Sequence, residues 1–403
     1  MAKALEAMLE LRGILREGDE ENPDVRLCFY GEPRLLVVGD EELREYELAL
    51  GRLWRADTEV HQTVGRKTLE SELLRVLRQT ANDSRELQRQ DADLMMANLK
   101  KSPVQGFFVL RRIEGVAFKG MEPCAAGSCQ IIELPRDLQS TPRTTDYILR
   151  EDMRKLDGVF VQYEVAAREP QRATELADEV FGKLEGLLRV AAGVWHESAQ
   201  IRILDEVGQW RREAIAIGRQ GVVGKKYEQS PYVHDIWIDE VVKSIESNHP
   251  GKYWPLVDSS QLSDLEKRAL RGILWLGKAY SSQRTEDAFL QCAIALEVAL
   301  VMNQRDVITP SILYQLAESV AVLLGRNQRE RLQIDEEMRK FYGKRSAIVH
   351  KGSDEVSRED CERFLSYARN CLIFLLGDDT YRQLGSLDAI HRHMKEFKFG
   401  DRQ

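Results

Sequence analysis

The C-terminal part of the sequence carries a series of helical patterns that restricts it to an all-helical fold. Ser263 and Glu266 have the spacing of a capping box, which marks the start of a helix. From there, apolar residues recur at helical spacing in five segments. The expected helices are Ser263–Ser281, Asp287–Val301, Ser311–Leu324, Arg329–Val349 (with a candidate interruption at Gly343) and Ser357–Leu376. The short connections between them predict an up-and-down bundle over residues 263–377.

The residues before this bundle mix strand and helix patterns. Residues 1–150 are expected to form one α+β domain, and residues 151–262 an α+β continuation or linker domain. Strand-like runs are Val25–Tyr30, Arg34–Val38, Val159–Val165, Ile201–Leu204, Ala214–Ile217 and a hairpin around Glu114 with arms Val104–Ile113 and Val116–Lys119. Helical periodicity covers Leu69–Leu99, with a break near Asn82, and Gln171–Val190. Residues 378–403 are expected to be a charged C-terminal tail. The predicted fold class is an α+β N-terminal region followed by an all-α C-terminal bundle.

Net charge, apolar runs and cysteine spacing indicate the compartment in which the protein is expected to work. The 403 residues carry a net charge of −8, so any site for a polyanion must be a local patch. The first ten residues form a charged amphipathic pattern rather than the apolar core of a signal peptide, and no apolar run is long enough to span a bilayer. The six cysteines lack the spacing of a disulfide framework, as in proteins of a reducing compartment. We therefore expect a cytoplasmic protein that does not contact a membrane.

Three patterns suggest metal or phosphate sites, but each fits a plainer interpretation better. Cys124 and Cys129 could be half of a zinc site, but no second pair follows at the usual spacing, so two loop thiols are favoured. The segment Gly221–Gly224 before Lys225 lacks the spacing of a phosphate-binding loop, which favours a flexible turn. His391 and His393 are only two candidate ligands in a terminal tail. No metal or other cofactor is predicted.

The segment Met338–Gly352 concentrates groups that suit RNA chemistry. Between Arg339 and Lys351 there are five basic residues and no acidic one. His350 can take up and return a proton near neutral pH, and Arg345 can bind a phosphate through two parallel hydrogen bonds. We expect the neighbouring cations to attract RNA through its phosphates; they are Arg339, Lys340, Lys344 and Lys351.

Helix geometry constrains how Arg345 and His350 can cooperate. On a regular helix, residues five apart point about 140° away from each other. Either the helix kinks, or the two side chains face different subunits. Glu297, the only charged residue in Ala288–Met302, either orients Arg345 or His350 or forms a structural pair.

The pattern Arg345-xxxx-His350, after a helix and before a glycine-containing loop and a last helix, resembles the HEPN ribonucleases, and in particular the ApeA-like HEPN group. The segment Trp275–Glu297 is similar to the first two helices of that group, so the resemblance covers about a quarter of the chain. Ser346 stands where many members have Asn, Asp or His after the arginine, and it keeps that position polar.

The resemblance implies a metal-independent endoribonuclease with a HEPN-like bundle. His350 and Arg345 would be catalytic, with Ser346 and Glu297 in support, and the products would be a 2′,3′-cyclic phosphate and a 5′-hydroxyl. HEPN proteins commonly combine the motifs of two bundles, so a homodimer through the bundle is expected. By analogy with antiphage abortive-infection effectors, the N-terminal residues would sense an unidentified trigger, and tRNA or phage transcripts would be the substrates. The alternative is a non-catalytic module that binds RNA or a partner protein.

Overall fold

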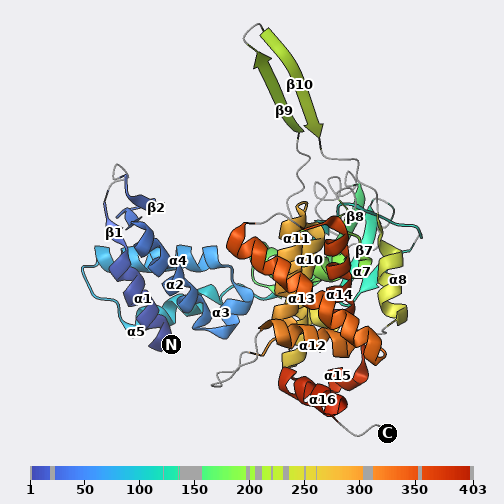
Figure 1. The fold of residues 1–403 in the computed structure, drawn as a ribbon. Helices are drawn as coiled ribbons and strands as arrows, with labels where there is room; N and C mark the ends of the chain where they lie inside the picture. The colour runs from blue at the N-terminus through green and yellow to red at the C-terminus, as the bar shows by residue number, and fades with distance from the viewer. Residues whose placement is uncertain are drawn as a thin grey trace. The chain divides into compact units, whose positions relative to one another are not determined.

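The computed structural model describes residues 2–18, 23–120, 122–134, 136, 157–196, 200–204, 211–218, 221–229, 236–248, 251–259, 261–302, 312–352 and 356–399. The chain divides into two compact units (Figure 1). The first comprises Met1–Val109 and Glu164–Ala177, and the second comprises Leu110–Tyr163 and Asp178–Gln403. The expected segments 263–377 and 378–403 therefore both belong to the second unit, together with most of 151–262.

The first unit packs helices around a small antiparallel sheet. Strand β3 (Leu35–Val38) lies between β1 (Arg16–Glu17) and β2 (Val25–Phe29). Its helices are α1 (Ala2–Ile14), α2 (Asp40–Arg55), α3 (Thr58–Thr63), α4 (Arg66–Asn82) and α5 (Arg89–Leu99). Their apolar sides share a core that includes Met8, Leu11, Tyr46, Leu50 and Leu73. The two expected strands and the helix break near Asn82 are confirmed.

A four-stranded sheet and a long helix follow, and the boundary between the units falls within them. The sheet order is β4-β8-β7-β6. Its members are β4 (Gln105–Arg112), β6 (Cys124–Ala126), β7 (Cys129–Leu134) and β8 (Gly158–Ala167), and the helix is α7 (Pro170–Ala192). Both β8 and α7 were expected from the sequence. Cys124 and Cys129 lie on paired strands rather than in a loop, and burial raises the pKa of each thiol to about 12. In the metal-free chain both thiols therefore stay protonated at neutral pH.

Two strand predictions and one turn prediction need correction. The hairpin around Glu114 does not form, because Glu114 forms a bridge with Arg202 while β5 (Val116–Ala117) pairs in parallel with β11 (Ile236–Trp237). The expected strand at Ile201–Leu204 is reduced to that single bridge. Gly221–Gly224 is neither a turn nor a phosphate loop, since it begins β10 (Gly221–Gln229), which pairs antiparallel with β9 (Arg211–Gly218).

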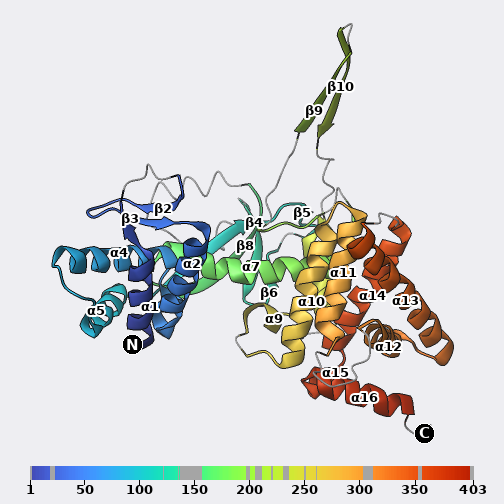
Figure 2. The ribbon, with the colours of Figure 1, turned by 60° about the vertical axis from the view of Figure 1, so that its left-hand side comes forward.

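The C-terminal half is mostly helical, as predicted. After α8 (Ile238–Asn248) and α9 (Pro255–Asp258) come α10 (Asp264–Ser281), α11 (Thr285–Leu300), α12 (Ile312–Leu324), α13 (Gln328–Lys351) and α14 (Arg358–Gly377). The capping box is confirmed, because Ser263 Oγ accepts from the Glu266 amide at 3.2 Å and the Glu266 carboxylate accepts from the Ser263 amide at 2.9 Å. Helix α11 packs against α10, α13 and α14 (Figure 2). None of the helices in the described ranges is long and apolar enough to cross a membrane.

Three phenylalanines join the central helices of this bundle. Phe289 on α11 lies 4.7 Å from Phe364 on α14 and 6.0 Å from Phe341 on α13, between ring centroids. Phe341 and Phe364 are 5.1 Å apart. On another side of the bundle, α7 approaches α10 closely, since a Cβ added to Gly277 would lie 2.9 Å from the Cα of Gly186. Glycine is therefore required at this crossing.

The expected charged tail is instead helical and packed. It forms α15 (Asp379–Leu384) and α16 (Leu387–Phe399). Leu387, Ile390 and Met394 recur at helical spacing on α16 and are buried, with Ile390 fully inaccessible. The apolar stripe explains why these residues fold onto the bundle despite their charged neighbours.

The packing of α16 can be tested by shortening one buried side chain. Ile390→Ala should lower the free energy of unfolding by about 2–5 kcal/mol, because it removes buried methyl groups and leaves a cavity. Glu396→Ala, at an exposed position of the same helix, is the control and should stay within about 0.5 kcal/mol of the parent. Urea denaturation measures both. Equal stability of the two variants would mean that α16 is not part of the packed bundle.

Candidate functional site

Helix α13 carries the Arg-xxxx-His pattern as one continuous helix. The Asn327 side chain caps its start by accepting a hydrogen bond from the Glu330 amide at 3.0 Å. Gly352 ends it in the left-handed conformation, with φ of 62°. The candidate interruption at Gly343 is absent from α13. Phe341, two residues earlier, is buried against α11 and α14, which holds this part of the helix in place.

Arg345 is held at one edge by a carboxylate from α11. Its Nη2 lies 3.4 Å from Oε1 of Glu297, and the Tyr342 hydroxyl donates a 3.0 Å hydrogen bond to the same oxygen. The Arg345 guanidinium also lies over the Tyr342 ring, 5.4 Å from its centroid. Burial and then the charge of Glu297 raise the pKa of Tyr342 to about 12. The phenol therefore stays neutral and continues to donate its proton to Glu297 at neutral pH.

Arg345 keeps unused hydrogen-bonding capacity. Its Nε is buried and has no hydrogen-bond partner among the residues that the structure describes. A buried donor without an acceptor costs free energy, and such a group calls for an explanation in function or in a missing partner. Nε and one terminal nitrogen of a guanidinium form a fork that suits phosphate, but Nε is buried and Nη2 lies against Glu297, so the Arg345 side chain must move before a phosphate oxygen can bind at this fork.

His350 stands apart from this cluster. It is exposed in the last turn of α13, and the described parts of the chain give its imidazole no hydrogen-bonding partner. Five helical positions separate it from Arg345 by about 7.5 Å along the axis and about 140° around it. Because α13 is unbroken, a kink does not bring the two side chains onto one face. Glu297 contacts Arg345 rather than His350.

Ser346 lies on the same side of α13 as His350. The two are four residues apart, which places them on one helical face. Gly343 is exposed on this side, and a Cβ added there would meet no atom within 4 Å. The surface beside His350 is therefore built from small side chains, and another surface can approach the helix backbone closely there.

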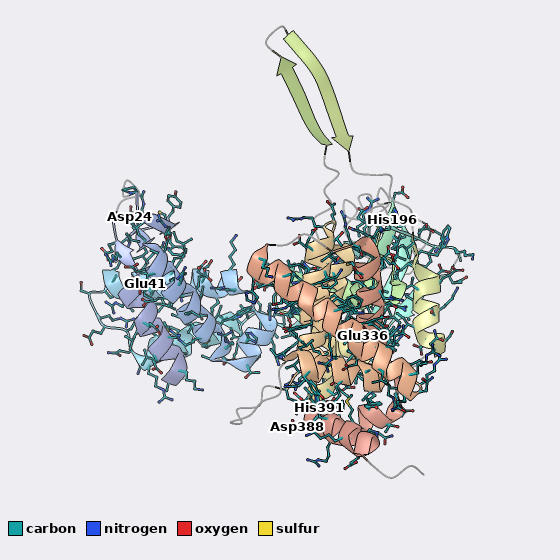
Figure 3. All side chains as sticks on the ribbon, in the orientation of Figure 1. Asp24, Glu41, His196, Glu336, Asp388 and His391 are labelled. Atoms are coloured by element: carbon teal, nitrogen blue, oxygen red, sulfur yellow. The ribbon has the colours of Figure 1, made fainter. Side chains whose placement is uncertain are left out.

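The expected cationic surround is largely neutralised within the chain. Three of its four members form ion pairs: Arg339 with Asp335 at 2.7 Å, Lys340 with Glu336 at 2.7 Å and Lys344 with Asp360 at 2.6 Å. Glu336 is labelled on α13 in Figure 3. For Lys351, the fourth, the described residues supply no counter-ion. RNA would therefore meet less positive charge here than the sequence indicates.

The sequence contained signals for some of these partners but not for all. Asp335 and Glu336 precede Arg339 and Lys340 by four residues, the spacing at which side chains on a helix meet. Tyr342 precedes Arg345 by three residues and could have been identified in the same way. The pairing of Lys344 with Asp360 joins α13 to α14 and depends on how these helices pack.

The two tail histidines do not form a metal site. His391 Nε2 lies 2.9 Å from the Leu300 carbonyl oxygen, whereas the His393 ring packs edge-on against Tyr381 at 5.6 Å. Nowhere in the described ranges do three His, Cys, Asp or Glu side chains gather as a metal ion would require.

Comparison with protein-family models, with curated proteins and with solved structures finds no match for this chain. The functional argument therefore depends on the residues and their geometry.

The ion pair between α13 and α14 has a measurable pH dependence. Hydrogen bonds from Lys344 and then Ser357 lower the pKa of Asp360. A carboxylate with a lowered pKa stabilises the fold above its unfolded pKa of about 3.9, and this contribution is lost as the pH falls through the folded value. Lys344→Met should therefore destabilise by up to about 1 kcal/mol at pH 7 and by less at pH 3. Urea denaturation at pH 7 and pH 3 measures this, with Lys351→Met as the control, because no counter-ion for Lys351 lies among the described residues. An effect of Lys344→Met that is the same at both values would contradict the pairing.

Proposed function

We propose that the C-terminal bundle is a HEPN-type endoribonuclease that cleaves RNA without a metal ion. The observation that carries this proposal is the arrangement of Arg345, half-buried and fixed by Glu297 but with an unsatisfied Nε, on the same helix as the exposed His350. A phosphate clamp and a group that can transfer a proton are the two components that this reaction needs. The resemblance to the ApeA-like HEPN group supports the same assignment.

In the proposed reaction the RNA supplies its own nucleophile. The 2′-oxygen attacks the adjacent phosphorus as its proton leaves, and the bond from phosphorus to the 5′-oxygen breaks. His350 takes the proton from the 2′-hydroxyl or gives one to the leaving 5′-oxygen. Arg345 binds the non-bridging oxygens and stabilises the charge that develops on them. The products are a 2′,3′-cyclic phosphate and a 5′-hydroxyl.

A homodimer would allow Arg345 and His350 to act on one phosphate although they point in different directions on a single helix. Arg345 and His350 diverge on one helix, but two copies of α13 facing each other across a two-fold axis would bring Arg345 of one chain toward His350 of the other. Two exposed apolar side chains on α13, Leu332 and Val349, support contact with a second copy. The pairing of Arg339 and Lys340 with acids reduces the repulsion between two such helices.

The rest of the chain would then control the nuclease. We propose that the N-terminal α+β residues receive an unidentified trigger, as in antiphage abortive-infection effectors, and that the protein acts in the cytoplasm. The substrate would be tRNA or phage transcripts.

One observation favours a second function, in which the bundle binds RNA or a partner protein without cleaving it. Within the described residues nothing orients the His350 imidazole, whereas a catalytic histidine usually has a fixed ring. Binding without cleavage in a dimeric preparation would favour this alternative.

Catalysis can be tested with a denaturing gel of tRNA and phage transcripts incubated with purified protein and a chelator. His350→Ala should lower the cleavage rate about 10²–10⁴-fold, because it removes proton transfer. Arg345→Ala should also abolish cleavage, and Arg345→Lys should restore little, since lysine keeps the charge but not the fork. His393→Ala, which alters a histidine outside α13, is the control. Wild-type cleavage by His350→Ala at an unchanged melting temperature would refute the enzyme assignment.

The composite site makes a separate prediction. In a mixture of Arg345→Ala and His350→Ala chains, each heterodimer holds one site with both residues intact if the site forms across the interface. Part of the activity should therefore return, up to about a quarter of the wild-type value, since half of the dimers are mixed and each has one intact site of two. Mixing Arg345→Ala with Arg345→Lys is the control and should restore little. If light scattering shows a monomer at a concentration at which the protein still cleaves RNA, the composite site is ruled out.

A further inference from the structure

One cavity of the second unit is lined by residues outside α13. It has a volume of about 580 Å³, which is within the range of small-molecule sites. The start of α10, Met302 after the end of α11 and one face of α16 line it. Figure 3 labels Asp388 and His391 on this helix. The side chains that contribute to its wall include Asp264, Arg268, Asp388, His391, Arg392 and Lys395.

The charge in this cavity is only partly compensated, since its wall holds three cations, Arg268, Arg392 and Lys395, and two acids, Asp264 and Asp388. Asp264 forms an ion pair with Arg268, with 3.2 Å between Oδ2 and Nε. Arg392 and Lys395 are exposed, and the described part of the chain provides neither with an ion pair. These two cations differ from those of α13, where three of four are paired with acids. The excess of one positive charge in the wall creates a local preference for an anionic ligand, although the whole chain is negative.

His391 is fixed at this site in a defined tautomer. The Leu300 carbonyl can only accept, so Nε2 of His391 must donate the 2.9 Å hydrogen bond. Nδ1 is left for a ligand, as an acceptor in the neutral ring or as a donor in the protonated ring. The imidazole is thus an oriented polar group in a cavity, not a solvated tail residue.

A smaller cavity lies on the other side of the same residues. Its volume is about 160 Å³, and it shares Met302, His391 and Lys395 with the larger one. Its remaining wall comes from α12 and α16 and combines apolar with polar side chains: Tyr314, Gln315, Glu318, Ser319, Val322 and Met394. It can accept a flat, uncharged group that also forms hydrogen bonds.

The spacing on α16 shows that this polar face is organised. Asp388, His391, Arg392 and Lys395 follow each other at intervals of three, one and three residues, which places them on one side of the helix. Leu387, Ile390 and Met394 are buried and anchor the helix. Packing of the apolar stripe therefore fixes the orientation of the charged side chains at the cavity.

We propose that these two cavities form a binding site for a free nucleoside phosphate. Arg392 and Lys395 donate hydrogen bonds to the phosphates, His391 joins them through Nδ1–H when its ring is protonated, and Asp388 accepts hydrogen bonds from the sugar hydroxyls. The base occupies the smaller cavity between α12 and α16. The site contains neither Arg345 nor His350, although Tyr314 in the wall of the smaller cavity lies under the Arg339 guanidinium of α13, 4.9 Å from the ring centroid.

Calorimetric titration of the full chain with ATP, GTP, CTP and UTP tests the proposal. At least one nucleotide should bind, and the double variant Arg392→Gln with Lys395→Gln should weaken that binding at least tenfold. Both side chains are exposed and form no ion pair with the described residues, so the fold should survive their replacement. The matched control is Lys267→Gln with Arg271→Gln, which removes the same charge from exposed positions of α10 outside the cavity wall. Failure of all four nucleotides to bind, or equal weakening by the control, would overturn the proposal.

Further titrations distinguish binding through the phosphates from binding through the nucleoside. Inorganic triphosphate should bind more weakly than the preferred nucleotide, and Val322→Trp, which fills the smaller cavity, should remove that difference. If triphosphate binds as tightly as every nucleotide, the nucleoside assignment is wrong. A 5′-triphosphorylated RNA that binds through Arg392 and Lys395 more tightly than any free nucleotide would overturn the assignment to a free ligand.

Discussion

The contact of Phe341 with Phe289 and Phe364 determines how α13 is oriented in the bundle. Along its 24 residues, α13 buries only Ile334, Met338 and Phe341. These three positions therefore set the rotation of the helix about its own axis, which decides that Tyr342 and Arg345 face Glu297. The last turns, with His350, extend beyond the buried positions. The candidate site thus depends on aromatic packing that itself takes no part in the chemistry.

The helical half of the fold could be predicted because its signals are local. Apolar stripes and caps such as Ser263 with Glu266 identify each helix without knowledge of its neighbours. The wrong predictions concern two kinds of feature. One is contacts between residues far apart in the sequence, and the other is apolar stripes that lie among many charged residues. Strand β5 pairs with β11, about 120 residues later in the chain, and nothing near Val116 indicates that partner. In α16, three apolar residues among many charged ones are enough for packing, although the composition resembles that of a tail.

The candidate site was only partly predictable for the same reason. The chemistry of Arg345 and His350 and the angle between them follow from residue type and helix geometry. Glu297 drew attention because it is a lone charge on an apolar helix. Its shared contact with Tyr342 and Arg345 required knowledge of how α11 and α13 pack. The unsatisfied Nε of Arg345 is a property of three-dimensional surroundings and leaves no trace in the sequence.

The ion pairs along α13 also affect how RNA would reach this helix. Acids at Asp335, Glu336 and Asp360 cancel most of the positive potential that the cations would otherwise project into solvent. A surface of paired charges exerts little force beyond a Debye length of about 8 Å. Diffusing RNA would thus not be steered toward α13, and capture would begin at roughly the unassisted rate of 10⁵–10⁶ M⁻¹s⁻¹. Selectivity among RNAs at this helix would then depend on the rate at which bound RNA dissociates.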